Sequence, residues 1–433
     1  MAKPQILVLG EDDAALALSA AGFSIAGDDG VRRQTAAVVI DTRGVFGIKA
    51  GELARSIKAA LGPRAGLFLA WTDNKSDYDV SVFDGALDAN ATHVALAARI
   101  NSSLRIAVMA DEARLRFKSL AKFGGAPKPP SLNIENVPRI LIFGAPGPDM
   151  MRFTSALEAR GAQAIAAFTS FTAFDYLHDG DFDGVAIIAH DDMASSLGFC
   201  AAMRRNARLF HMPCLVMGSP DFANPQDAIL KGATDFAVSG DDDDAASERL
   251  LDFVDEKRSR DALALAFAAA RAPGAMDQAT GLYGPDFFVS HLDSLVTRAN
   301  ETDRPLSIAL VRFAPNPILT ALSAGRGLDR VVGQAGAMMA RLVRAEDVAA
   351  RLDRTTFVVA FPSSDEDAAE VAAARIAAVL ECTAFDTGND VAAYSNDAPL
   401  QIKLNVASAE LLLSESAQDL IARAQVRLPL DSL

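Results

Sequence analysis

Short apolar runs alternate with helical stretches over the first part of the chain. Residues 6–9 form one such run and lead into Glu11 and Asp12, and residues 36–40 form another that ends at Asp41. Strands that alternate with helices predict a parallel α/β sheet, whose ligand sites lie beyond the carboxyl ends of the strands. We therefore expect Glu11, Asp12 and Asp41 to converge at one edge of the sheet.

The same pattern returns after a polar, proline-rich stretch at residues 124–137, which is typical of a linker. Residues 140–144 echo residues 6–10, and residues 232–235 echo residues 85–88. The sequence therefore predicts a second copy of the α/β unit. Ala145 and Pro146 follow its first strand in place of acids, so we expect this copy to lack the acidic site.

A long helical pattern follows the second unit. Asp241 to Asp244 precede it, and acids favour a helix N-terminus through the helix dipole. The pattern covers residues 245–271 and stops near Pro273 and Gly274, as helices do. We expect this helix to be the rod that joins the second unit to the rest of the chain.

Two short apolar runs near the C-terminus, residues 348–352 and 357–361, are separated by four polar residues and predict a β-hairpin. Arg344 and Asp347 come directly before it. The hairpin is followed by a helical pattern over residues 365–380, with Ser363 or Ser364 as the expected cap.

The length, the net charge and the cysteine content of the chain limit the number of domains, the binding partners and the cellular compartment that we expect. The 433 residues are enough for about three domains, each with its own core. A net charge of -15 argues against DNA binding, which needs a basic face. We expect neither a signal segment nor a membrane span, because no long apolar run occurs at residues 1–9 or elsewhere. The three cysteines are few and widely spaced. We interpret them as reduced core residues of a cytoplasmic protein.

The segment that begins Asp277-Gln278-Ala279-Thr280-Gly281-Leu282, together with an Arg-x-x-Asp motif five residues before a hairpin turn, resembles a GGDEF domain. With two receiver-like units before it, the chain resembles the PleD-type receiver-receiver-GGDEF family. That resemblance implies two flavodoxin-like receiver domains, each a doubly wound parallel sheet, and an α+β domain of the nucleotide-cyclase type. The expected boundaries are 1–123 for the first receiver, 124–137 for the linker, 138–260 for the second receiver, 261–276 for a helical connector and 277–433 for the GGDEF domain.

For the first receiver, the resemblance implies that Asp41 accepts phosphate and that Glu11, Asp12 and Asp41 hold Mg²⁺. The family pattern is incomplete here, because Gly10 stands where the first acid is usual. No lysine occurs between Asp88 and Arg99 to pair with a phosphoryl group. An acidic loop of a packing domain is the alternative interpretation.

For the GGDEF domain, the resemblance implies a binding site for cyclic di-GMP, in which Arg344, Asp347 and Arg375 contact a stacked dimer of the dinucleotide. These residue types suit that ligand. Guanidinium groups pair with guanine O6 and N7 or with phosphate, and a carboxylate accepts from guanine N–H groups. A surface salt bridge between Arg344 and Asp347 is the alternative.

The catalytic positions of the family have changed. The metal-binding acids of the family correspond to Arg312, in the strand at residues 306–313, and to Thr355 and Thr356 in the turn. Its phosphate-cradling glycines correspond to Asp353 and Arg354. Threonines are poor ligands for hard cations, and side chains at the glycine positions keep the backbone from the phosphates. We therefore expect no diguanylate cyclase activity, and so no enzyme.

These expectations lead to a cytoplasmic cyclic di-GMP effector that is catalytically inactive and homodimeric. By resemblance it acts in cell-cycle control within a two-component phosphorelay, through recruitment to a cell pole and regulated proteolysis, with protease adaptors and cell-cycle regulators as partners. Two alternatives remain open: a residual diguanylate cyclase regulated by phosphorylation of Asp41, and a scaffold without a ligand.

Overall fold

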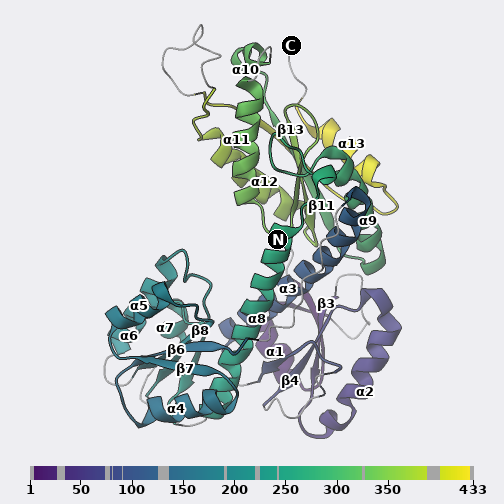
Figure 1. The fold of residues 1–433 in the computed structure, drawn as a ribbon. Helices are drawn as coiled ribbons and strands as arrows, with labels where there is room; N and C mark the ends of the chain where they lie inside the picture. The colour runs from purple at the N-terminus through teal and green to yellow at the C-terminus, as the bar shows by residue number, and fades with distance from the viewer. Residues whose placement is uncertain are drawn as a thin grey trace.

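The computed structural model contains three β-sheets, each with its own helices (Figure 1). We call the three sheets with their helices, in chain order, the first, second and third domains. It describes residues 4–26, 35–73, 79, 81–89, 91–124, 136–189, 193–219, 225–240, 243–323, 327–387 and 400–429. Most of the predicted linker at 124–137 lies outside these ranges. Within them, no helix combines the length and the apolar character that a membrane span requires.

The first sheet is entirely parallel, with the strand order β2-β1-β3-β4-β5. Its strands are β1 (Gln5–Leu9), β2 (Ser24–Ile25), β3 (Thr35–Asp41), β4 (Leu67–Thr72) and β5 (Gly85–Asp88). Helices α1 (Asp12–Ala20) and α3 (His93–Leu120) cover one face, and α2 (Gly44–Leu61) covers the other. The predicted doubly wound α/β architecture is confirmed for this part of the chain.

The second sheet repeats the first, with the order β10-β9-β8-β6-β7 and all strands parallel. Its strands are β6 (Arg139–Gly144), β7 (Gln163–Ala167), β8 (Gly184–Ala189), β9 (Cys214–Gly218) and β10 (Asp235–Val238). Its helices are α4 (Pro148–Ala159), α5 (Ser170–Asp179), α6 (Met193–Arg205), α7 (Pro225–Leu230) and α8 (Asp243–Ala269). The two copies therefore share the strand order of flavodoxin-like folds.

The sequence predicted that residues 85–88 correspond to residues 232–235 of the second unit. The structure shows a different correspondence. Asp84 accepts a hydrogen bond from the backbone N–H of Phe68 at the start of its neighbouring strand, and Thr234 accepts one from Cys214 in the same way. Gly85 and Asp235, which open β5 and β10, are therefore the matching residues. Sequence similarity alone placed the match three residues off.

The third sheet is antiparallel, with the order β12-β13-β11-β14. Its strands are β11 (Leu306–Phe313), β12 (Val348–Arg351), β13 (Thr356–Pro362) and β14 (Leu404–Glu410). Its helices are α9 (Pro285–Thr302), α10 (Pro317–Leu322), α11 (Gly327–Leu342), α12 (Glu366–Glu381) and α13 (Ala417–Arg427). The predicted hairpin is confirmed as β12 and β13, in which Arg351 pairs with Phe357.

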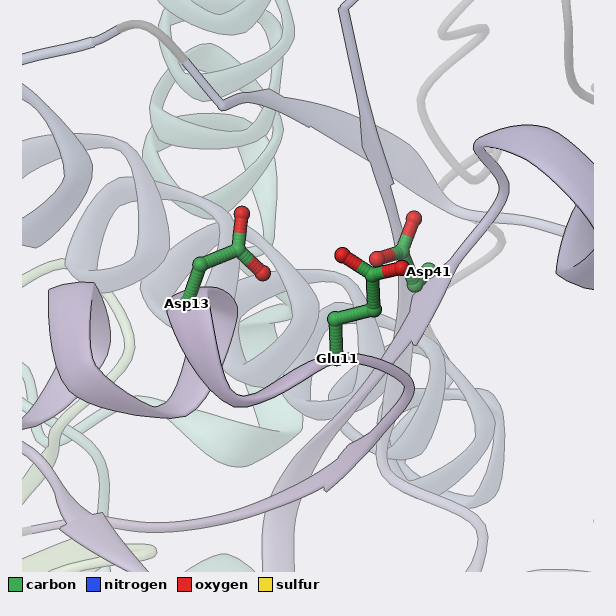
Figure 2. Close-up of side chains that lie close together, drawn as sticks. All are labelled: Glu11, Asp13 and Asp41. Carbon is green, nitrogen blue, oxygen red and sulfur yellow. The ribbon is translucent and has the colours of Figure 1, made fainter.

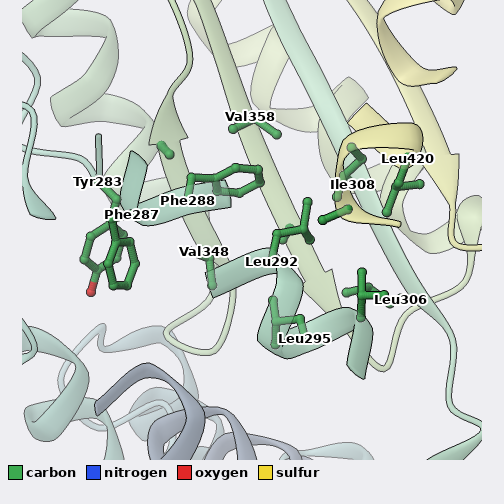
Figure 3. Close-up of a cluster of buried hydrophobic side chains, with 14 of the residues drawn as sticks. Tyr283, Phe287, Phe288, Leu292, Leu295, Leu306, Ile308, Val348, Val358 and Leu420 are labelled. Atoms are coloured by element: carbon green, nitrogen blue, oxygen red, sulfur yellow. The ribbon is translucent and has the colours of Figure 1, made fainter. Parts of the chain in front are cut away.

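Alternation along the central strands of this sheet builds a core on each face. Ile308 and Val358 point to the α9 side, whereas Ala309 and Val359 point to the α11 and α12 side. Figure 3 shows the first of these cores, in which Phe288 and Leu292 of α9 pack on the sheet.

Two long helices connect the other sheets to the third one: α3 comes from the first sheet and α8 from the second. They lie side by side (Figure 1). The C-terminal half of α3 contributes Met109, Phe117 and Leu120 to the core beneath α9, and the end of α8 contributes Leu263 and Phe267. The sequence predicted α8 as a connecting rod, and this is confirmed. It did not predict that α3 reaches the third sheet as well.

Two smaller expectations were wrong. Helix α12 is capped by Asp365, whose carboxylate accepts from the N–H of Ala368, and not by Ser363 or Ser364. Ser363 has a φ of 54°, which is not the extended conformation of an N-cap. Of the cysteines, Cys200 and Cys214 are buried as expected, but Cys382 is exposed.

Candidate functional site

The Arg-x-x-Asp motif forms the tight turn between α11 and β12. Within it the carboxylate of Asp347 accepts a hydrogen bond from the N–H of Arg344 at 2.9 Å, and the N–H of Asp347 donates to the carbonyl of Arg344 at 3.2 Å. Asp347 and its neighbour Glu346 are buried, whereas Arg344 is exposed. The turn therefore carries a buried carboxyl group, that of Asp347, and an exposed guanidinium, that of Arg344.

Burial gives Asp347 unusual acid-base chemistry. Loss of solvent raises the pKa of its carboxyl group to about 7, and the nearby charge of Glu346 acts in the same direction. The hydrogen bond from the Arg344 N–H and the charge of Arg344 lower the pKa, but by less. Near neutral pH this carboxyl group is therefore close to its midpoint of ionisation.

Arg375 reaches the same place from α12. It is exposed, and its guanidinium donates to the carbonyl of Leu342, the last residue of α11, at 3.1 Å. Leu342 lies two residues before Arg344. All three residues expected to bind the dinucleotide therefore lie at the C-terminal end of α11.

Sequence reasoning missed the residues of α3 that contact this turn. The buried guanidinium of Arg116 donates to the carbonyls of Ala345, Glu346 and Asp347, at 3.2, 3.1 and 3.1 Å. Arg105, earlier on the same helix, forms an ion pair with Glu346 at 3.1 Å. The only signal in the sequence is that the charged residues 105, 112 and 116 share one face of a helix.

A buried polar network surrounds Arg116. Its Nε donates to Glu112 at 2.8 Å, and the same carboxylate oxygen lies 2.9 Å from Nε2 of His291 on α9. The other ring nitrogen of His291 lies 3.0 Å from the hydroxyl of Ser119. Burial acts to raise the pKa of Glu112, but His291 and Arg116 outweigh it, so the pKa is lowered. The network joins the first domain to the third.

The hairpin turn is held by its own side chains. Asp353 accepts from the N–H groups of Thr355 and Thr356 at 2.9 and 2.8 Å, and Arg354 donates to the carbonyl of Ser323. Arg312, on the neighbouring strand, donates to the carbonyl of Pro429. These are the residues that were expected to replace the metal ligands and the glycines of the GGDEF family.

The acids of the first domain do converge at the sheet edge, but with one change of residue (Figure 2). Carboxylate oxygens of Glu11, Asp13 and Asp41 all lie within 4.8 Å of one another. The expectation that Asp12 belongs to this set was wrong, because the first turn of α1 presents Asp13 to the cluster instead. Gly10 cannot be replaced by an acid here, since a Cβ on it would lie 2.2 Å from that of Asp41.

Arg43 lies among these acids and contributes a positive charge to the cluster. Its guanidinium donates to both oxygens of Asp41, at 3.0 and 2.8 Å, and to Asp13 at 3.0 and 2.8 Å. Burial acts to raise the pKa of Asp41, but the hydrogen bonds and charge of Arg43 lower it overall. The carboxylates are the ligands that Mg²⁺ prefers. With Arg43 paired to them, however, the residues present do not fit a metal ion, and the phosphoacceptor role of Asp41 stays a prediction.

The substitution Arg43→Ala is expected to increase the affinity of the first domain for Mg²⁺ or Mn²⁺ by at least about tenfold, because it leaves three close carboxylates without a cation. Calorimetric titration of the full chain with MnCl₂ measures this. Arg55→Ala is the matched control, since Arg55 pairs with the exposed Asp79 in the same domain. Equal affinities for the wild type and Arg43→Ala would contradict the role of Arg43.

Residues 274–429 match the family model described as "Diguanylate cyclase, GGDEF domain". The chain therefore carries a GGDEF domain related to the diguanylate cyclases. It is also similar to "Response regulator PleD" of Caulobacter vibrioides (strain NA1000 / CB15N), with 28% identity over 186 residues, which cover 43% of this chain and 41% of PleD. The match thus spans less than half the length of that relative.

Two solved structures are similar to about a third of the chain. The FimX GGDEF domain from Pseudomonas aeruginosa is 25% identical, with a TM-score of 0.31, over 35% of this chain and 90% of that one. The GGDEF domain of DgcB from Caulobacter crescentus, in complex with c-di-GMP, is 18% identical, with a TM-score of 0.32, over 36% and 88%.

The family match corrects one expectation. The expectation that the chain is not an enzyme was wrong, because the family that residues 274–429 match is one of diguanylate cyclases. The replacements at Arg312, Thr355 and Thr356 alter the expected metal ligands but do not by themselves show inactivity.

Proposed function

We propose that the chain binds cyclic di-GMP at the α11–β12 turn and acts as an effector that couples this binding to protein-protein interaction. The observation that carries the proposal is the gathering of Arg344, Asp347 and Arg375 at one end of α11, within a GGDEF domain.

The chemistry of these groups suits the ligand. The exposed guanidinium groups of Arg344 and Arg375 can donate to guanine O6 and N7 or to phosphate oxygens. The carboxylate of Asp347 can accept from guanine N–H groups, and because the pKa of Asp347 is about 7, binding that uses the carboxylate releases a proton near neutral pH. Such charge-assisted hydrogen bonds contribute about 1.5–3 kcal/mol each.

The test is a calorimetric titration of the full chain with cyclic di-GMP. We expect saturable binding of about two dinucleotides per chain, as for a stacked dimer, and a loss of at least about tenfold in affinity for Arg344→Ala. Arg330→Ala is the control, since Arg330 is also exposed and on α11 but pairs with Asp386. A wild type that does not bind contradicts the function, and binding that survives Arg344→Ala contradicts the site.

The finer parts of the proposal concern partners. We propose a homodimer, with cell-cycle regulators and protease adaptors as partners in polar recruitment and regulated proteolysis. These rest on the family resemblance alone. Light scattering with and without cyclic di-GMP tests the dimer, and a monomer under both conditions counts against it.

A second candidate function is the diguanylate cyclase reaction itself, which the family match favours. Incubation of the full chain with Mg²⁺ and GTP tests it. Formation of cyclic di-GMP supports this candidate, and absence of the product leaves the binding function alone.

A further inference from the structure

The α11–β12 turn is shaped by a helix of another domain. Arg116 of α3 is only 3% exposed, and it holds three successive carbonyls of the turn, those of residues 345, 346 and 347. One guanidinium therefore fixes the backbone between Arg344 and Asp347. The direction in which both side chains leave the turn depends on that backbone.

Arg116 is in turn held by both long helices. Its Nε is paired with Glu112 one helical turn away on α3, and its guanidinium stacks over the ring of Phe267 on α8, 4.4 Å from the ring centre. The second contact to the turn, between Arg105 and Glu346, comes from the same face of α3. The contacts of Arg116 and Arg105 with the turn therefore depend on the docking of α3 on the third domain.

We propose that Arg116 is a positioning residue for the cyclic di-GMP site, and that docking of the first domain and binding of the dinucleotide are thermodynamically linked through it. This inference rests on the proposed function. Arg116 itself touches no ligand: it orders the turn in advance, so that binding does not have to order it. Linkage is reciprocal, so the bound dinucleotide must stabilise the docked α3 by the same factor.

The test compares Arg116→Met with Arg99→Met in the full chain, by titration with cyclic di-GMP. Arg99 is a close match, because it is also on α3, pairs with Asp252 and Glu256 of α8 and stacks near Phe253. It contacts the second domain and not the turn. We expect Arg116→Met to weaken binding at least about tenfold, Arg99→Met to change it less than twofold, and Arg116→Lys to restore part of the loss.

A second readout separates positioning from general stability. In the wild type, cyclic di-GMP is expected to slow hydrogen exchange of the backbone amides in residues 105–117, the part of α3 that holds the turn, and in Arg116→Met this protection is expected to disappear. If Arg116→Met does not fold, Arg105→Ala decides the question, since Arg105 is partly exposed and is expected to weaken binding at least about threefold.

The outcomes distinguish this inference from the proposed function. A wild type that does not bind cyclic di-GMP overturns both. A wild type that binds, with unchanged affinity in Arg116→Met, or in Arg105→Ala where Arg116→Met does not fold, overturns the positioning role and leaves the proposed function standing. Ligand protection of α3 that is equal in the wild type and Arg116→Met overturns it as well.

Discussion

Asp347→Asn is expected to stabilise the third domain at pH 8, by at most about 4 kcal/mol, and to change its stability little near pH 4. In the folded chain burial raises the pKa of Asp347 from 3.8 to about 7. The folded state therefore keeps a proton that the unfolded state loses between these values. Stability must fall as pH rises through this window, and the wild type bears the whole cost above pH 7.

An asparagine at position 347 removes this cost, because its amide stays neutral and its oxygen can still accept from the Arg344 N–H. Hydrogen exchange of the buried amides in β12 and β13 reports the opening free energy of this domain at each pH.

Asp183→Asn is the control, and its effect on stability at pH 8 is expected to be opposite to that of Asp347→Asn. Burial acts to raise the pKa of Asp183, but hydrogen bonds from Arg258 and from the N–H of Arg139 lower it overall, so this variant is expected to destabilise the second domain at pH 8. A third domain that is equally or less stable in Asp347→Asn than in the wild type at pH 8 would contradict the raised pKa.

The second large effect is expected for Glu112→Ala, which should destabilise the docking of α3 on the third domain by about 3–5 kcal/mol. Glu112 is 2% exposed and is shared by Arg116 and His291. Its removal leaves a buried guanidinium without its carboxylate, and this costs far more than the pair contributes as a whole.

The same exchange measurement, read at the amides of α3 and α9, gives the size of this loss. Asp261→Ala removes one partner of the exposed Lys257–Asp261 pair on α8 and is expected to cost less than about 1 kcal/mol. A loss for Glu112→Ala as small as that of Asp261→Ala would show that the network does not hold the two domains together.

Local patterns predicted the elements that short-range chemistry determines. The strands of all three sheets that were named from apolar runs, the β12–β13 hairpin and the helix α8 follow from periodicity and turn residues. The family resemblance implied that Arg344, Asp347 and Arg375 contact one ligand, which stays a prediction, and the structure places Arg375 against Leu342, two residues before Arg344.

Contacts between distant parts of the chain could not be predicted in this way. Nothing in the sequence around Arg116 indicates that its partners are the carbonyls of residues 345–347, because that contact depends on how α3 docks. The same holds for Arg43, whose partner Asp13 lies thirty residues away. The choice of Asp13 over Asp12 depends on the phase of the first turn of α1, and the boundaries of helices are the least certain part of sequence reasoning.

A crystal structure of the full chain grown with cyclic di-GMP tests the central claim most directly. The account predicts density for guanine bases against the guanidinium groups of Arg344 and Arg375, with a guanine N–H directed at the carboxylate of Asp347. Dinucleotide bound only at the hairpin turn around Asp353, with the end of α11 unchanged, would contradict it.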